Sequence, residues 1–143
     1  MADIAVTAKN VRPLNNAVIR RWPAGAAGST GQVVYRDADG AKPARANAAG
    51  TSRGRGIVVG VNGQPGQTTF AAGDALDVVT HGPVEFAAGM TVGAEVFVSA
   101  ATAGATDQTA PSTATQVVFA VGYAESATIL YVAPQAAAPV ALQ

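Results

Sequence analysis

The sequence of 143 residues contains no cysteine and only one histidine, His81. Without cysteine, disulfide bonds, thiolate catalysis and cysteine-ligated zinc are excluded. His81 lies in the segment Thr80-His81-Gly82-Pro83, with Asp77 nearby but without a nucleophile motif. A catalytic histidine needs both an orienting partner and a target, so this pattern favours a surface histidine at a turn. We therefore expect a protein that is not an enzyme.

Charged residues make up 13% of the chain and aromatic residues 6%, whereas soluble domains usually have about 25% charged residues. Such low charge argues against disorder. No apolar run approaches the roughly 18 residues of a membrane-spanning helix. The first residues lack the basic and apolar regions of a secretory signal. We expect no membrane partner, and a chain that stays in a cytoplasm or leaves it as part of a released particle.

Motifs for metals and cofactors are also missing. The segment Asp37-Ala38-Asp39-Gly40 resembles the start of a calcium loop, but its twelfth position is Ala48 rather than a bidentate glutamate. The sequence has no phosphate-binding loop, no dinucleotide fingerprint and no Gly-x-Ser-x-Gly motif. We therefore expect neither a bound metal nor a cofactor.

Small residues and short β-branched runs dominate what is present. The chain has 33 alanines and 16 glycines, and Gly, Pro, Asp and Asn separate the apolar runs. These runs are 32–36, 56–61, 75–80, 84–86, 94–99, 116–123 and 128–132. No run of ten or more residues has the 3.6-residue periodicity of a helix. The pattern predicts an all-β domain at residues 31–132, a small β-barrel or β-sandwich of short strands.

The two ends of the chain differ from residues 31–132 in composition and pattern. Residues 1–30 lack alternation and contain several Pro, Asn and Gly residues. They predict an extended N-terminal arm with one short ordered piece near 17–22, which ends before Pro23. Residues 133–143 are rich in Pro and Ala and predict a flexible tail.

An internal repeat is visible when the sequence is shifted by 62 residues. The shift aligns Gly31 with Gly93, Val34 with Val96, Tyr35 with Phe97, Ile57 with Phe119, Val59 with Val121 and Gly60 with Gly122. Each unit has a glycine, a Val-aromatic pair, a loop of small residues and an apolar run that contains Val-Gly. The repeat predicts two similar halves that pack their apolar faces together.

Charge is balanced over the whole chain but not along it. All nine basic residues lie in the first 55 positions, opposed there by three acids, whereas the remaining six acids follow with no base. This asymmetry predicts either a basic docking segment or a fold that mixes the two halves on its surface. The basic part has only Trp22 and Tyr35 for stacking beside its Arg53-Gly54-Arg55-Gly56 segment, so we expect no nucleic-acid partner.

Trp22, the only tryptophan, follows Arg20 and Arg21 directly. Tryptophan and arginine are enriched where interfaces bind most strongly. The candidate partner-contact residues are therefore Lys9, Arg12, Arg20, Arg21 and Trp22. The alternative is that Trp22 closes the bottom of the core.

Four segments together resemble a known family. They are 72–84 (AGDALDVVTHGPV), 89–99 (GMTVGAEVFVS), 110–113 (APST) and 121–132 (VGYAESATILYV). In their order and spacing they are similar to the small β-rich capsid decoration (cement) and head-fibre-type proteins of tailed bacteriophages. The earlier segment 31–35 resembles the first strand of the same family, so the resemblance covers roughly residues 31–132. Met90 and Phe97 stand where the family pattern has Leu and Tyr, and residues 1–30 have no counterpart.

The resemblance implies a virion structural protein on the capsid exterior, assembled in the host cytoplasm. Such proteins are commonly homotrimers at local three-fold positions, where they bind the major capsid protein and stabilise contacts between its subunits. The five candidate contact residues would then face the capsid. The alternative is a binding module associated with the phage tail, collar or fibre.

Overall fold

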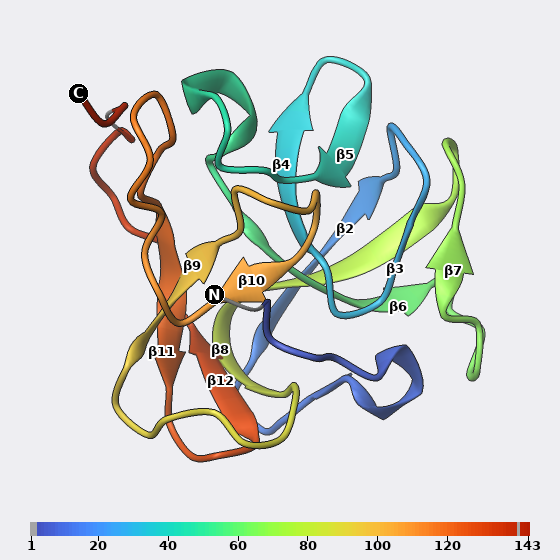
Figure 1. Ribbon diagram of the computed structural model, residues 1–143. Coiled ribbons are helices and arrows are strands. Elements are labelled where there is room, and N and C mark those ends of the chain that lie inside the picture. Colours follow the sequence, from blue (N-terminus) through green and yellow to red (C-terminus); the bar gives the residue numbers. More distant parts are fainter. Residues whose placement is uncertain (1–2, 140) are drawn as a thin grey trace.

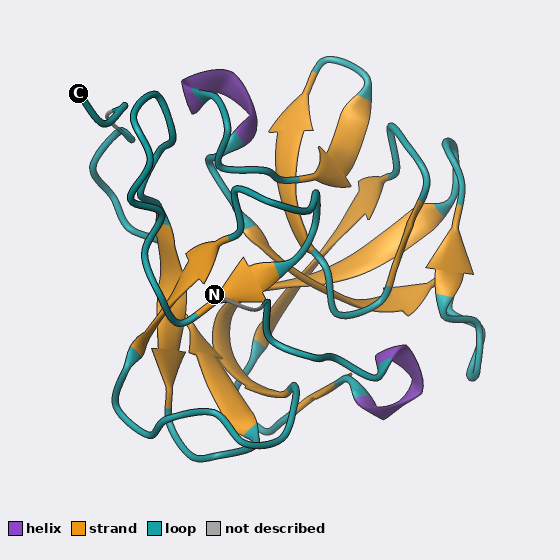
Figure 2. Ribbon diagram, in the orientation of Figure 1, coloured by secondary structure: helices purple, strands orange, loops and turns teal. Residues whose placement is uncertain are grey.

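The computed structural model describes residues 3–139 and 141–143, and the chain is all-β (Figures 1 and 2). Helical structure in these residues is confined to two single turns, η1 (Ala8–Asn10) and η2 (Ala49–Thr51). The strands are β1 (Arg12–Pro13), β2 (Val18–Pro23), β3 (Gly28–Ser29), β4 (Val33–Asp37), β5 (Gly40–Pro43), β6 (Gly56–Val61), β7 (Thr69–Phe70), β8 (Ala75–Glu85), β9 (Glu95–Val98), β10 (Thr106–Asp107), β11 (Ala120–Ala124) and β12 (Ile129–Val132). The predicted fold class is confirmed: one antiparallel sheet curls into a half-barrel beside a small second sheet of β3 and β7.

The main sheet has two halves with the same strand order. Its sequence of neighbours is β10-β9-β11-β12-β8-β6-β4-β5. In the first half a hairpin (β4 and β5) is followed by β6, which pairs with β4, and then by β8, which pairs with β6. In the second half β9, β10, β11 and β12 repeat this order. The halves join where β12 pairs with β8, so the two similar halves expected from the 62-residue repeat are present as topology.

The registers of the two halves differ. Val34 pairs with Gly56 in the first half, and a strict repeat would pair Val96 with Val118. The observed partner of Val96 is Gly122, four residues further on. The repeated sequence therefore specifies which strands pair, whereas the alignment along the strands is set separately in each half.

Two hydrophobic cores lie on opposite faces of β4, β6 and β8. The large core contains Val33, Ile57 and Val79, together with Phe86 and Phe119. The residues next to the first three in sequence, Val34, Val58 and Val78, belong to the small core, which also contains Leu76 and Phe70. Because side chains alternate across a strand, each of these adjacent buried pairs places one side chain in the large core and one in the small core.

Strand β8 connects the halves and bends at Gly82. Residues before the bend pair with β2 and β6, and residues after it pair with β12 and β1. The sequence indicated a strand end and a turn at Thr80–Pro83, and this was wrong: β8 continues through these residues. Gly82 has φ of 112°, a conformation that glycine adopts without steric cost. The strand can therefore change partners without stopping.

The N-terminal segment does not project from the domain. Ile4 donates its backbone N–H to Thr106 of β10, β1 and β2 pair with β8, and Thr30 donates its hydroxyl to the carbonyl of Ala8. The predicted ordered piece is present as β2. The expectation that residues 1–30 form an extended arm apart from a β domain that begins at residue 31 is wrong, because β1 and β2 pair with β8. These residues supply strands to the main sheet.

The C-terminal residues also bond to the domain. Ala133 and Gln135 donate backbone N–H groups to Val121 and Ala120, and Leu142 exchanges backbone hydrogen bonds with Thr115 and Gln116. The segment predicted to be a flexible tail is thus held along residues 115–121 in the part of the chain that the structure describes.

Asp74 fastens the turn that leads into β8. Its carboxylate accepts hydrogen bonds from the backbone N–H of Ala71 (2.9 Å) and from the side-chain amide of Asn62 (3.2 Å), and these bonds hold its pKa below the ordinary value. The unfolded chain therefore binds a proton more readily than the folded chain. The resulting stability is present above the unfolded pKa and is lost as pH falls through the folded one.

We expect Asp74→Asn to lower the free energy of unfolding at pH 7 and to have a smaller effect at pH 3. Urea unfolding followed by circular dichroism at both pH values measures this difference. Glu125→Gln is the matched control, because no described residue donates a hydrogen bond to that exposed carboxylate. An equal loss at both pH values for Asp74→Asn would contradict the ionic origin of the effect.

Candidate interaction site

Strand alternation separates the two adjacent arginines of β2. Arg21 lies opposite Asp77 of β8, and its Nε is 3.0 Å from the Asp77 carboxylate. This contact raises the pKa of Arg21. Arg20 and Trp22 project to the other face of β2, where their partners on β8 are Val78 and Leu76 of the small core. Arg21 is therefore neutralised, whereas Arg20 forms no ion pair within residues 3–139 and 141–143.

Trp22 joins the small core to a surface groove. Its side chain is half-buried against the small core. The guanidinium carbon of Arg36, from β4, lies 4.7 Å from the centre of the Trp22 ring. This is cation–π geometry, which holds the guanidinium over the ring face. The alternative expectation for Trp22 is met in part, because its side chain packs on the small core and also borders the groove. A contact of Trp22 with a partner stays a prediction.

The groove has an unusually uniform charge. Arg20, Arg36 and Arg55 line it together with His81, and residues 134–136 form part of its wall. Its volume is about 530 Å³. No acidic side chain lines the groove, and none of its three arginines forms an ion pair with any residue that the structure describes. The groove therefore presents three guanidinium groups whose charge no described acid neutralises.

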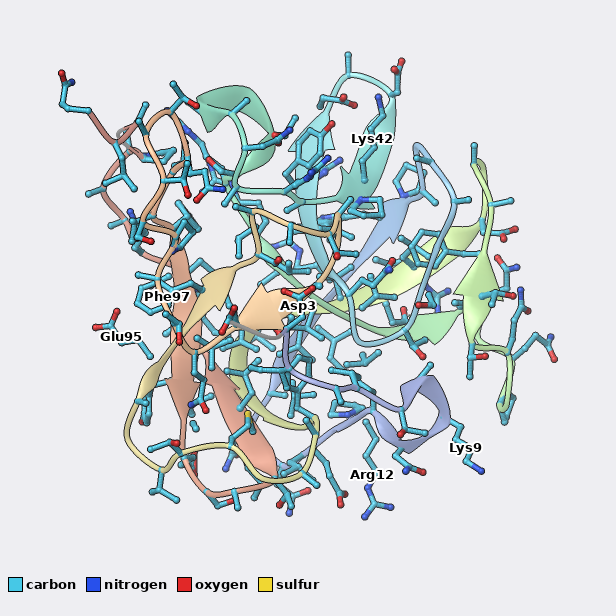
Figure 3. All side chains as sticks on the ribbon, in the orientation of Figure 1. Asp3, Lys9, Arg12, Lys42, Glu95 and Phe97 are labelled. Carbon is cyan, nitrogen blue, oxygen red and sulfur yellow. The ribbon has the colours of Figure 1, made fainter. Side chains whose placement is uncertain are left out.

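Lys9 and Arg12 lie elsewhere. They border a second hollow, of about 420 Å³, that also includes Glu85. Arg12 is bound there, with its Nε 2.6 Å from the Glu85 carboxylate. Figure 3 shows Lys9 and Arg12 at the same end of the molecule, away from Lys42. The five candidate contact residues are thus not one surface: Arg20 and Trp22 share the groove, Arg21 is on the opposite face, and Lys9 and Arg12 are at a separate site.

The basic and acidic parts of the sequence mix on the surface, but incompletely. Two of the ion pairs join them, Arg12 with Glu85 and Arg21 with Asp77. Lys42 instead pairs within the basic part, with Asp37 and Asp39. What remains concentrated is the group of three arginines in the groove.

The candidate contact residues expected from the sequence did not include Arg36, Arg55 or His81, although all three line the groove with Trp22. Arg36 follows Val34 by two residues, which places it on the small-core face of β4. That alternation is visible in the sequence. The pairing of β2 with β8, which brings Arg20 and Trp22 beside this face, is a long-range contact with no local signal.

The side chains of the groove are suited to contact an anion. Guanidinium groups present planar pairs of N–H donors that match carboxylate and phosphate oxygens. Within residues 3–139 and 141–143, no three His, Asp or Glu side chains are grouped to hold a metal ion. Over the same residues, no helix is long and apolar enough to cross a membrane.

Compared with protein-family models, with curated proteins and with solved structures, the chain has no match.

Proposed function

We propose that this chain is a structural protein of a tailed-phage virion, which decorates the outer surface of the capsid and stabilises contacts between major capsid subunits. The order and spacing of the motifs over residues 31–132 support the proposal, and the all-β fold agrees with it. The observation that carries it is the groove of Arg20, Arg36, Arg55 and Trp22, a concentrated set of adhesive side chains with unneutralised charge.

The mechanism is adhesion rather than catalysis. Arginine and tryptophan contribute most to protein–protein contacts when they are held in place before binding. Here Trp22 is fixed against the small core, and Arg36 is held over its ring. These two contacts restrict the side chains of Trp22 and Arg36 before binding, which lowers the entropy lost when the chain binds a capsid surface.

The direct test is co-sedimentation of the purified chain with phage heads assembled without it. We expect saturable binding at a stoichiometry that matches the local three-fold positions of the lattice. The triple variant Arg20→Ala/Arg36→Ala/Arg55→Ala should bind about ten-fold more weakly. This is the loss of affinity expected when the binding free energies of three exposed ion pairs are removed together. Arg53→Ala is the matched control, because Arg53 is exposed in the same loop as Arg55 but does not line the groove.

Absence of binding at every salt concentration would overturn the capsid proposal. The same assay with purified tails then tests the alternative, a module of the tail, collar or fibre.

Two further expectations have their own tests. Sedimentation velocity of the free chain tests the homotrimer implied by the resemblance. A panel of ester and glycoside substrates tests the expectation that the chain is not an enzyme.

A further inference from the structure

We infer that the groove binds an extended acidic segment of a partner polypeptide, whose carboxylates pair with Arg20, Arg36 and Arg55. The inference rests on the proposed function, because it takes the groove as the contact surface of the chain. It adds the chemistry and the conformation of the partner. Three observations support it: the arrangement of charge, the partly open edge of β2 and the covered ring of Trp22.

The positive charge of the groove favours an anionic partner. Arg20 comes from β2, Arg36 from β4 and Arg55 from the loop before β6, and all three are exposed. Three segments that are distant in sequence therefore deliver the same charge to one hollow with no acid in its lining. Like charges that approach one another without counterions destabilise the fold. A partner with several carboxylates removes this repulsion on binding.

Strand β2 offers a partly open edge beside these arginines. One edge pairs with β8, and the other lies against β5 at the Pro23 end, where Ala24 and Ala41 form an isolated bridge. No other strand in the described chain pairs with this second edge. Val18 and Ile19 of this strand are 51% and 45% exposed. An unpaired strand edge is a template for an added strand. A polypeptide paired there would lie beside β2 in the plane of the sheet, and every second side chain would project to the face that carries Arg20 and Trp22.

The spacing of an added strand suits alternating acids. Side chains on one face of a strand recur every second residue, at about 6.6 Å. A segment with an acid at every second position would therefore direct all of its carboxylates towards the groove, while its main chain bonds to β2. This predicts a partner segment with alternating acids rather than a cluster of adjacent ones.

The groove is poorly built for nucleic acid. Surfaces that bind single strands present several free aromatic faces for base stacking. Trp22 is the only aromatic side chain apart from His81 that lines this groove, and Arg36 already lies over its ring. The ring is thus not free to stack with a base, whereas the guanidinium above it remains free to bind a carboxylate.

The experiment titrates the folded chain with a capped heptapeptide in which Thr and Glu alternate, followed by calorimetry. A peptide with Gln in place of Glu is the first control. A peptide of the same sequence with N-methylated alternate amides, which cannot pair fully with a strand edge, is the second. We expect the Glu peptide to bind, and both control peptides to bind at least about ten-fold more weakly. The emission of Trp22, the only tryptophan, should change on binding to the wild-type chain.

Variants locate the site. Arg20→Ala/Arg36→Ala/Arg55→Ala should reduce affinity for the Glu peptide by about ten-fold or more, and the corresponding triple substitution by Lys should restore only part of it. Arg53→Ala should leave affinity unchanged. Calorimetry is used for these variants because loss of Arg36 alters the surroundings of Trp22 directly. Unchanged far-UV circular dichroism shows that the variants are folded.

The outcomes separate the inference from the proposed function. Peptide binding that the triple Ala variant loses, with no binding to heads, supports the inference and overturns the capsid proposal. Head binding that the triple variant weakens, with no peptide binding, supports the capsid proposal and overturns the inference. Head binding that the triple variant retains in full would show that the groove is not the capsid contact, and would overturn the inference and the adhesion mechanism together. Stronger binding of a thymidine oligonucleotide of equal charge would overturn the acidic-peptide assignment. So would self-association that the triple variant abolishes, because the groove would then be occupied by a second copy.

Discussion

Gly82→Ala is expected to lower the free energy of unfolding by about 3 kcal/mol or more. This figure combines the cost of a strained backbone conformation with the cost of a steric conflict. At φ of 112°, an L side chain is strained at this position whatever space is available. The space is also absent, because a Cβ at residue 82 would lie 2.7 Å from the Cα of Ala17. The conflicting atom is backbone and cannot swing aside. Either β8 straightens or the segment that leads into β2 moves away.

Urea unfolding monitored by far-UV circular dichroism measures this change. Gly50→Ala is the control, because a Cβ at Gly50 would have no neighbour within 4 Å and its backbone does not require glycine. That substitution should change stability by less than about 0.5 kcal/mol. If Gly82→Ala were as mild as Gly50→Ala, β8 could bend without positive φ, and the account of how it changes partners would be wrong.

Gly82 also shows why sequence reasoning placed a turn where the chain has a strand. Gly-Pro dipeptides typically mark turns. The segment before Gly82 alternates apolar and polar residues as a strand does, so the strand was expected to end at this dipeptide. The local pattern correctly located a change of direction. It did not indicate that hydrogen-bonding partners would be present on both sides of the change, and those partners keep β8 continuous.

The parts of the fold that sequence predicted well depend on local signals. The apolar runs at 56–61 and 128–132 coincide with β6 and β12 within one residue. The 62-residue repeat predicted two similar halves, because each copy carries a Val-aromatic pair, a loop of small residues and an apolar run, and the two halves have the same strand order. The register within each half depends on cross-strand packing, for which the repeat has no signal.

The candidate site was harder to predict because its residues meet through long-range pairing. Had residues 18–23 been recognised as a strand, alternation alone would have separated Arg20 and Trp22 from Arg21. The partner of Arg21 is Asp77, 56 positions away, and nothing near β2 in sequence indicates it. Likewise, Arg36 reaches Trp22 only because β4 and β2 border the same small core.

The second large effect is expected for Phe119→Ala. Phe119 is 1% exposed and fills the large core just before β11. Removing a buried phenylalanine side chain typically costs about 3–5 kcal/mol, through lost burial and the cavity left behind. Because adjacent residues of β4, β6 and β8 face opposite cores, the two cores share their backbone. A loss in the large core should therefore reach the small one.

This coupling makes Trp22 a reporter for a distant substitution. We expect Phe119→Ala to shift the urea midpoint seen by Trp22 emission as far as the midpoint seen by far-UV circular dichroism, because both report one cooperative transition. Val92→Ala, at a side chain that is 64% exposed, should leave both midpoints almost unchanged. A Trp22 transition that stays in place while the circular dichroism transition moves would mean that the cores unfold separately. Residues 18–23 would then belong to a smaller unit that carries the groove without the large core.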